Sequence, residues 1–282
     1  MEHYRLEHVA DGVVAALHRP GGGGVGNAAI VRTGDSTIVF DTGMTPQAGA
    51  ELRRTAVEIA PVSFIVNSHW HGDHVRGNQA FSDVEIVATG RTKDLIETRA
   101  AERLAEQRAI DPDEYLVSLP EGPDKETARH LAATIADVRL TPPTTTFEER
   151  LELARGCELV TLGGGHTESD AFLVLPDRGV AMLGDLLFNR IHPWMGDGDP
   201  RRWIEILDAV ADLGATRFVP GHGAVAGLED VRALRDHLRW FLDDPEGLAE
   251  RYPDWEFDGM LERNRAALQR TADTAAGGGG GI

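Results

Sequence analysis

The sequence predicts an α/β protein. Short apolar runs with the length and composition of β-strands recur through both halves of the chain. One of them, residues 62–67, follows a segment with helical spacing over residues 46–59. Polar turns rich in histidine, aspartate and glycine come directly after several of these runs. The carboxyl ends of strands are where α/β proteins place their chemistry, so these turns are the candidates for a functional site.

The N-terminal third reads as β structure. Residues 13–17, 28–31 and 37–40 are short apolar runs, and a Thr-Gly-Asp turn signal separates the last two. Gly21 to Gly24 break the chain between the first two runs. This glycine run is either a flap near a substrate or the tip of a slack hairpin. We favour the tip, because the run lacks the Gly-Lys-Ser/Thr ending of a phosphate loop.

A charged, helical region separates the two β-rich halves. Residues 91–110 and 125–136 have helical spacing, Gly122-Pro123 interrupts them and Pro142-Pro143 ends the region. We expect one domain over residues 1–276, with a helical insertion at about residues 91–150 and a disordered glycine-rich tail at 277–282. The insertion is either a solvated helical hairpin or a cap over a substrate pocket, and the sequence does not rank the two.

The remaining elements follow the same patterns. Further strands are predicted at residues 84–87, 151–153, 159–162, 171–175, 180–183 and 218–219. Further helices are predicted at residues 203–213, 228–242 and 261–271.

Composition narrows the class of function. The net charge of −18, with no basic cluster, disfavours a nucleic-acid partner. There is no N-terminal signal peptide and no long apolar run, so we expect neither a membrane span nor a membrane partner. Cys157 is the only cysteine, which rules out an intrachain disulfide, and we expect a small buried thiol there. A cytoplasmic protein acting on a small molecule is the expectation.

The motif Ser68-His69-Trp70-His71-Gly72-Asp73-His74 follows the predicted strand 62–67. Imidazoles and carboxylates are ligands of zinc and similar divalent metals. Alternate residues of an extended segment share a face, so His69 and His71 can reach one point. Asp73 and His74, beyond Gly72, turn towards a second point. Trp70 points away from both ligands beside it, and we expect it in the core or the pocket wall.

Three more potential ligands lie downstream, each next to a glycine and past an apolar run: His166, Asp185 and His222. Asp41 closes the run 37–40. It is either a turn former or an acceptor for the second N–H of a metal-bound imidazole, and we favour the acceptor.

These motifs together resemble the metallo-β-lactamase-fold hydrolase superfamily over residues 13–228. The resemblance implies an αββα sandwich of two packed mixed β-sheets with helices on the outer faces. It implies two divalent metal ions, with zinc expected and iron or manganese as alternatives. The implied ligands of one ion are His69, His71 and His166, and those of the other are Asp73, His74 and His222. Asp185 would bridge both ions, and Asp41 matches the first motif of the family.

One position separates the branches of this superfamily. Antibiotic-degrading members commonly have cysteine where Asp185 stands, so the chain looks more like the glyoxalase II, lactonase and thioesterase branch. Glyoxalase II-like enzymes carry a longer C-terminal helical part than this chain offers, which disfavours glutathione thioesters as substrates.

The implied chemistry is hydrolysis. Two metals about 3.5–4 Å apart can share a water and lower its pKa towards neutrality, and the hydroxide would attack the carbonyl of a thioester, lactone or related ester. Asp73 or a metal-bound water would pass a proton to the leaving group, while Asp185 would hold the site together. The alternatives are a phosphodiesterase or nuclease of the tRNA-processing type and a single-iron persulfide dioxygenase.

The stretch 186–199 should form the rim of the site, because it leaves directly from Asp185. It holds three candidate substrate contacts, Arg190, His192 and Trp194. His192 is an extra metal ligand, a substrate contact or a loop histidine with protein partners, and we favour the last two because both metal sites already have their donors. Residues 196–199 read as a turn and N-cap before the helix near Trp203.

Overall fold

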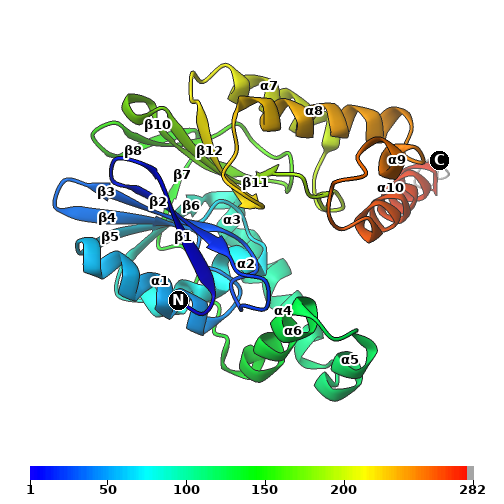
Figure 1. The fold of residues 1–282 in the computed structure, drawn as a ribbon, viewed down its shortest axis with the longest axis horizontal. Coiled ribbons are helices and arrows are strands. Elements are labelled where there is room, and N and C mark those ends of the chain that lie inside the picture. The colour runs from blue at the N-terminus through cyan, green and yellow to red at the C-terminus, as the bar shows by residue number, and fades with distance from the viewer. Residues whose placement is uncertain (278–282) are drawn as a thin grey trace, which may run out of the picture.

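The predicted strands assemble into two β-sheets in a computed structural model that describes residues 1–277 (Figure 1). The first sheet has seven strands in chain order. They are β1 (Tyr4–Ala10), β2 (Val13–His18), β3 (Ala28–Thr33), β4 (Ser36–Phe40), β5 (Val62–Val66), β6 (Glu85–Thr89) and β7 (Thr145–Phe147). Pairing is antiparallel from β1 to β4 and parallel from β4 to β7.

The second sheet has five strands in the order β12-β11-β10-β9-β8. They are β8 (Arg150–Ala154), β9 (Cys157–Thr161), β10 (Ala171–Leu175), β11 (Val180–Phe188) and β12 (Arg217–His222). Only the β11–β12 pair is parallel. Both sheets are therefore mixed, as the resemblance implied.

Apolar side chains from both sheets meet in one buried layer, which includes Ile38, Val66, Leu173 and Met182. Complete burial of one such side chain stabilises the fold by about 1.5–3 kcal/mol. The layer explains why these strands read as nearly continuous apolar runs. Cys157 is part of it, so the predicted buried thiol is confirmed.

Helices cover the outer face of each sheet (Figure 1). Helix α1 (Pro46–Ile59) packs on the first sheet through Leu52 and Ala56. Helices α7 (Pro200–Ala211) and α8 (Leu228–Asp243) cover the second sheet. Thr45 is the N-cap of α1: its hydroxyl accepts a hydrogen bond from the Ala48 N–H, and Pro46 is the first helical residue. Asp199 is the N-cap of α7, as predicted. The αββα sandwich is confirmed.

Two strands were not predicted. Strand β1 carries alternating charged residues and lies at a sheet edge, so it lacks an apolar run. Strand β7 has three residues and pairs with β6, inside the range assigned to the insertion. The helical part of the insertion therefore ends before Thr145, and the predicted boundary at 150 is wrong.

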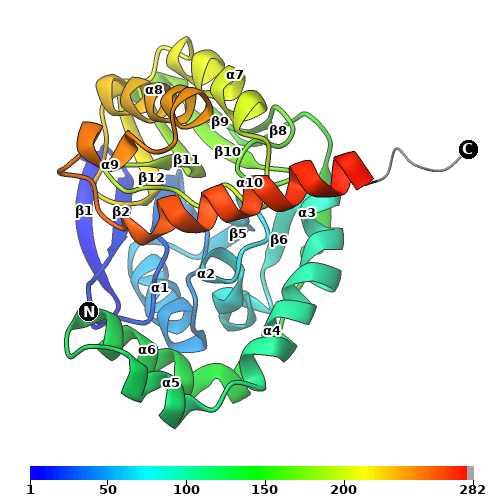
Figure 2. The same ribbon diagram turned by 90° about the vertical axis from the view of Figure 1, so that its right-hand side faces the viewer.

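The insertion between β6 and β7 holds α3 (Gly90–Leu95), a π-helical turn (Ile96–Ala100), α4 (Ala101–Arg108), α5 (Pro112–Ser118) and α6 (Pro123–Thr134). Helices α4 to α6 extend from the same end of the sandwich as α9 (Leu248–Arg251) and α10 (Gly259–Gly277) (Figure 1). Figure 2 shows α10 crossing in front of that end. Gly277, which was expected in the tail, belongs to α10, and the rest of the expected tail, residues 278–282, lies outside the described residues.

The glycine run between β2 and β3 is not a slack hairpin tip, and that prediction is wrong. Gly22, Gly23 and Gly24 are buried. The Gly23 N–H donates to His3 Nδ1 at 3.0 Å, and its carbonyl accepts from the Thr45 hydroxyl at 3.1 Å. The loop is thus held against the first turn of α1.

Among the described residues no helix combines the length and apolarity needed to cross a membrane.

Candidate metal centre

The histidine-rich turn lies between β5 and the short helix α2 (Gly72–Val75). His71 is the N-cap residue of α2, so His69 and His71 precede the helix while Asp73 and His74 belong to its first turn. This change from extended to helical backbone at Gly72 sends the two pairs of side chains towards different points, as the spacing predicted.

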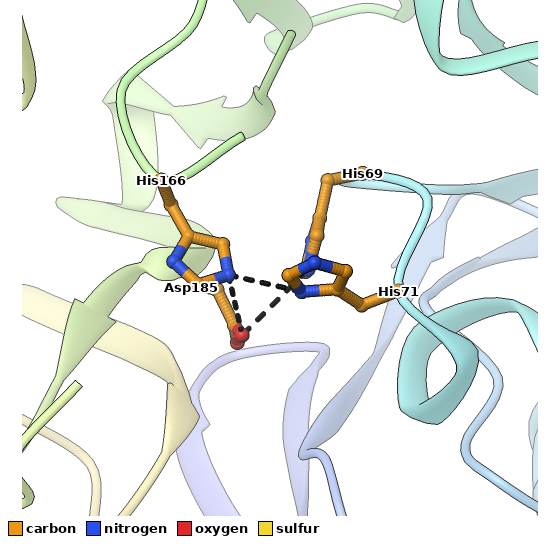
Figure 3. Close-up of side chains that lie close together, drawn as sticks. All are labelled: His69, His71, His166 and Asp185. Carbon is orange, nitrogen blue, oxygen red and sulfur yellow. Dashed lines mark hydrogen bonds and ion pairs between the residues drawn. The ribbon is translucent and has the colours of Figure 1, made fainter. Parts of the chain in front are cut away.

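The first group of donors contains His69, His71, His166 and Asp185, whose ligand atoms all lie within 4.8 Å of one another (Figure 3). All four side chains are buried. His166 Nε2 lies 3.1 Å from His71 Nδ1 and 3.2 Å from Asp185 Oδ2, and His69 Nε2 lies 3.6 Å from the same oxygen. In Figure 3, His69 and His71 approach from one side, and His166 and Asp185 approach from the other.

The second group contains Asp73, His74 and His222. Asp73 Oδ2 lies 3.5 Å from His74 Nε2 and 3.3 Å from His222 Nε2. The two groups adjoin at Asp185, whose Oδ1 lies 3.0 Å from His74 Nε2 and 3.4 Å from His222 Nε2. One carboxylate therefore faces the first group with one oxygen and the second group with the other.

These distances fit divalent metal ions. Ligand atoms about 2.0–2.2 Å from a tetrahedral ion are separated from each other by about 3.3–3.6 Å. Three of the converging atoms, His69 Nε2, His74 Nε2 and Asp185 Oδ1, are buried without a hydrogen-bond partner in the protein. Buried polar atoms normally have a partner, and a metal ion would supply one for each of them.

The structure holds the two carboxylates in the form that binds metal. Burial alone would raise the pKa of Asp185, but the neighbouring His74 and His222 lower it well below its ordinary value. Burial opposes ionisation of Asp73 as well, and His74 and His222 again lower its pKa well below the ordinary value. Both side chains are therefore carboxylates near neutral pH.

Asp41 orients His74. Its Oδ2 lies 2.8 Å from His74 Nδ1, and its two oxygens accept from the Ser68 N–H and hydroxyl at 2.8 and 2.7 Å. The Nδ1–H donates to the carboxylate, which leaves His74 Nε2 free to face the second group. Asp41 also turns the chain, with a φ of 60°, so both alternatives for this residue hold.

Asp197 plays the corresponding part for His71, and the sequence analysis missed it. Its Oδ2 accepts from His71 Nε2 at 3.0 Å and from Trp194 Nε1 at 2.7 Å, and Arg103 donates to its Oδ1 at 2.8 Å. Burial would raise the pKa of Asp197, but the hydrogen bond from His71 lowers it below its ordinary value. The glycines on both sides of Asp197 were the available signal, because they let a carboxylate approach another loop closely.

Close backbone approach completes the centre. A Cβ on Gly221 would collide with the Asp185 carboxylate and the Gly184 backbone. Strand β11 continues through Asp185 to Phe188, with a register shift at Gly184, so Asp185 lies within the strand and not beyond it as predicted. Trp70 is buried with Leu95 and Ile96, in the core as expected.

A cleft of about 830 Å³ opens above the donors. His71, Asp73, His166, Asp185 and His222 form its floor. One wall comes from the insertion, including Tyr115, Thr127, Ala128 and Leu131, and another from the C-terminal segment, including Glu256, Phe257 and Met260. The insertion therefore shapes the cleft, as expected for a cap. Its helix α5 has no buried residue, as expected for a solvated hairpin.

The three expected rim residues have different positions. Trp194 and His192 line the cleft. His192 is also tied to the C-terminal part, since its Nδ1 lies 2.8 Å from His237 Nε2 and its Nε2 lies 3.4 Å from Asp258 Oδ1. Arg190 is exposed and does not line the cleft. Its φ of 57° turns the chain just after β11. We therefore assign no substrate contact to Arg190.

Comparison with known proteins gives sequence relatives of two kinds. A linear primary-alkylsulfatase of Pseudomonas sp. (strain ATCC 19151) is 25% identical over 244 residues, which cover 76% of this chain and 45% of that protein. A beta-lactamase-like protein 2 homolog of Caenorhabditis elegans is 26% identical over 231 residues, covering 78% of this chain and 64% of that protein. The chain thus spans about half to two thirds of these relatives.

Solved structures share the fold. A metallo-beta-lactamase from Hirschia baltica superposes with a TM-score of 0.61 at 17% identity, covering 83% of this chain and 97% of that one. The mono-zinc form of the metallo-beta-lactamase FIM-1 from Pseudomonas aeruginosa gives 0.61 at 18% identity, covering 83% and 95%. The model of the metallo-beta-lactamase superfamily matches residues 21–222, which include every residue of both donor groups. Because that match spans well over half of the chain, the protein belongs to the metallo-beta-lactamase superfamily.

Proposed function

We propose that the protein is a dinuclear metal-dependent hydrolase that cleaves a small-molecule thioester, lactone or related ester. The observation that supports this most strongly is the pair of adjoining donor groups that share Asp185 at the floor of a cleft. Imidazoles and carboxylates in this ratio suit zinc, with iron or manganese as alternatives. We propose a cytoplasmic location on composition alone.

The side chains of the two donor groups would have different roles in hydrolysis. Two bound divalent ions would acidify a water and polarise a carbonyl. Asp185 offers one oxygen to each group, so it fixes their separation. Asp73 is 17% exposed at the cleft floor, where it faces His74 and His222 and can pass a proton to the leaving group.

The charge of the cleft supports a carbonyl substrate over a phosphodiester. Outside the donor groups, Arg5 is the one arginine or lysine among its lining residues, whereas Asp124 and Glu256 are acidic. The cleft walls therefore offer little positive charge to a polyanionic nucleic acid. The nuclease alternative is therefore disfavoured.

The single-iron dioxygenase alternative leaves a feature unexplained. It would use the first group and give no role to the second, where Asp73, His74 and His222 also converge. An alkyl sulfate, the substrate class named in the Pseudomonas relative, remains the second candidate because the apolar cleft walls would accept its alkyl chain. The scarcity of cationic side chains ranks it below the carbonyl esters.

A substrate panel tests the proposal. Zinc-, manganese- and iron-loaded protein would be assayed with acyl thioesters, lactones, simple esters, alkyl sulfates, phosphodiesters and persulfides. We expect turnover of a thioester, lactone or ester that a chelator abolishes and added metal restores. Turnover confined to phosphodiesters, alkyl sulfates or persulfides would overturn the carbonyl assignment.

A further inference from the structure

His18 lies at the end of β2, in the wall of the same cleft as the donor groups. It is not part of either donor group and belongs to none of the family motifs matched above. Its own strand and the glycine loop that follows position it. A histidine in a cleft above a proposed metal centre can act on the substrate directly, so its hydrogen bonds decide what it can do.

Asn27 ties His18 to the second donor group. The Asn27 Oδ1 accepts from the His18 N–H at 2.8 Å. The Asn27 Nδ2 donates to the carbonyls of Pro220 and Gly223, at 3.0 and 2.9 Å, on both sides of His222. The Asn27 N–H donates to the Gly221 carbonyl at 2.7 Å. One side chain thus fixes the backbone that carries His18 relative to the turn that carries His222.

The tautomer of His18 follows from one contact. The Val25 N–H donates to His18 Nδ1 at 3.0 Å. A ring nitrogen that accepts a hydrogen bond carries a lone pair, so the proton of the neutral ring is on Nε2. No other described residue hydrogen-bonds to this ring, and Nε2 is the nitrogen left to face the cleft. Burial, and then the nearby His222, lower the pKa of His18 to about 4, in agreement with a neutral ring.

We propose that the Nε2–H of His18 donates a hydrogen bond to the acyl oxygen of the substrate, on the side of the second donor group. The proposal deepens the proposed function and rests on it for the identity of the acyl group. A preoriented donor of this kind is most effective where negative charge develops on an oxygen, as it does when a carbonyl is attacked. The same N–H would contact the carboxylate of the acid product.

Two substitutions separate this role from loop anchoring. His18→Asn places an amide oxygen near Nδ1, so it keeps an acceptor for Val25 and loses the donor at Nε2. His18→Gln places its NH2 near Nε2, so it keeps the donor and loses the anchor. His8→Asn, on the exposed part of β1, is the matched control. All variants would be zinc-loaded and their metal content measured, because neither position supplies a metal donor.

We expect His18→Asn to lose about a hundredfold to a thousandfold in kcat with little change in KM and with full metal content. His18→Gln should recover to within about tenfold of the unsubstituted protein, and His8→Asn should match it. Full activity in His18→Asn, or equal losses in His18→Asn and His18→Gln, would overturn the proposal.

Binding of hexanoate, a carboxylate that stands for the acid product, gives a readout independent of turnover. Calorimetric titration should show about tenfold weaker binding to His18→Asn than to His18→Gln. If no ester, thioester or lactone is turned over but this binding pattern holds, the proposed function fails and the role of His18 stands. Equal binding by both variants, or no binding by the unsubstituted protein, would overturn the role of His18.

Discussion

The two donor groups differ in their access to solvent. In the first group every side chain is buried, and Asp185 is only 4% exposed. In the second group His222 is 19% exposed and Asp73 is 17% exposed, and both form part of the cleft floor. The first group is therefore enclosed by protein on nearly all sides, while the second opens towards any bound substrate.

The protein supports the groups differently. Two carboxylates hold the first group: Asp197 accepts from His71, and Asp170 accepts from the N–H groups of Gly165 and His166 at 2.7 and 2.9 Å. In the second group Asp41 lies behind His74, and Asn27 holds the turn that carries His222 through the carbonyls of Pro220 and Gly223. The enclosure of the first group suits it to retaining an ion, and the exposure of the second group suits it to contact with a substrate.

Removing the shared carboxylate should have the largest effect. Asp185→Asn keeps the shape of the side chain but removes the charge that faces both groups. We expect kcat/KM to fall by about a thousandfold or more, with loss of the ion at the second group. Steady-state kinetics and elemental analysis would measure both. Asp94→Asn, an exposed change on α3, is the control, and retention of two ions with normal turnover would contradict the bridge.

The next effect should separate the groups. His222→Ala removes a donor only from the second group, so the first should keep its ion and the metal content should fall from about two to about one per chain. His69→Ala should weaken the binding of both ions. The first group then lacks one donor, and Asp185, which faces both groups, is less firmly held by the first ion. Elemental analysis after dialysis would distinguish the outcomes. Loss of both ions in His222→Ala would contradict retention of an ion by the first group alone.

Smaller effects should come from the carboxylates behind the ligands. Asp197→Asn should weaken the first site and Asp41→Asn the second, each by about 10- to 100-fold in metal affinity. Asparagine tolerates the φ of 60° at position 41, so the change tests charge more than backbone strain. Competition with a metal-binding dye would give the affinities. The comparison fails if each variant weakens the wrong site.

The sequence predicted those features of the centre that depend on neighbouring residues, and it did not predict contacts between residues far apart in the chain. The donors could be found because each follows an apolar run next to glycine, which is a local pattern. Asp197 has glycines on both sides, but it could not be paired with His71, because the two residues are 126 positions apart. Asn27 reaches Pro220 across 193 positions for the same reason. Most strands were predictable from their apolar runs, and the sandwich from the family resemblance. The polar edge strand β1 and the three-residue β7 gave no such signal.

A further effect lies outside both groups, at the C-terminal wall. Burial, and then His192, lower the pKa of His237 from 6.5 to about 3. Between these values the unfolded state binds the extra proton, so stability falls as the pH drops from 6.5 towards 3, by at most about 1.4 kcal/mol per pH unit from this group. His237→Gln should flatten that dependence.

Chemical unfolding of metal-free protein at about pH 7 and about pH 5 would measure the difference. Metal-free samples keep the donor groups in the same state in both proteins. His8→Gln, at an exposed position, should leave the pH dependence unchanged. An equally steep loss of stability in His237→Gln and in the unsubstituted protein would rule out His237 as a source of acid sensitivity.

The central claim is that two ions share Asp185, one in each donor group. A zinc-loaded crystal measured at the zinc absorption edge tests it most directly, because anomalous peaks locate the ions without reference to activity. We predict two peaks about 3.5–4 Å apart on either side of the Asp185 carboxylate. One peak among His69, His71 and His166, with none beside Asp73, His74 and His222, would contradict the dinuclear site.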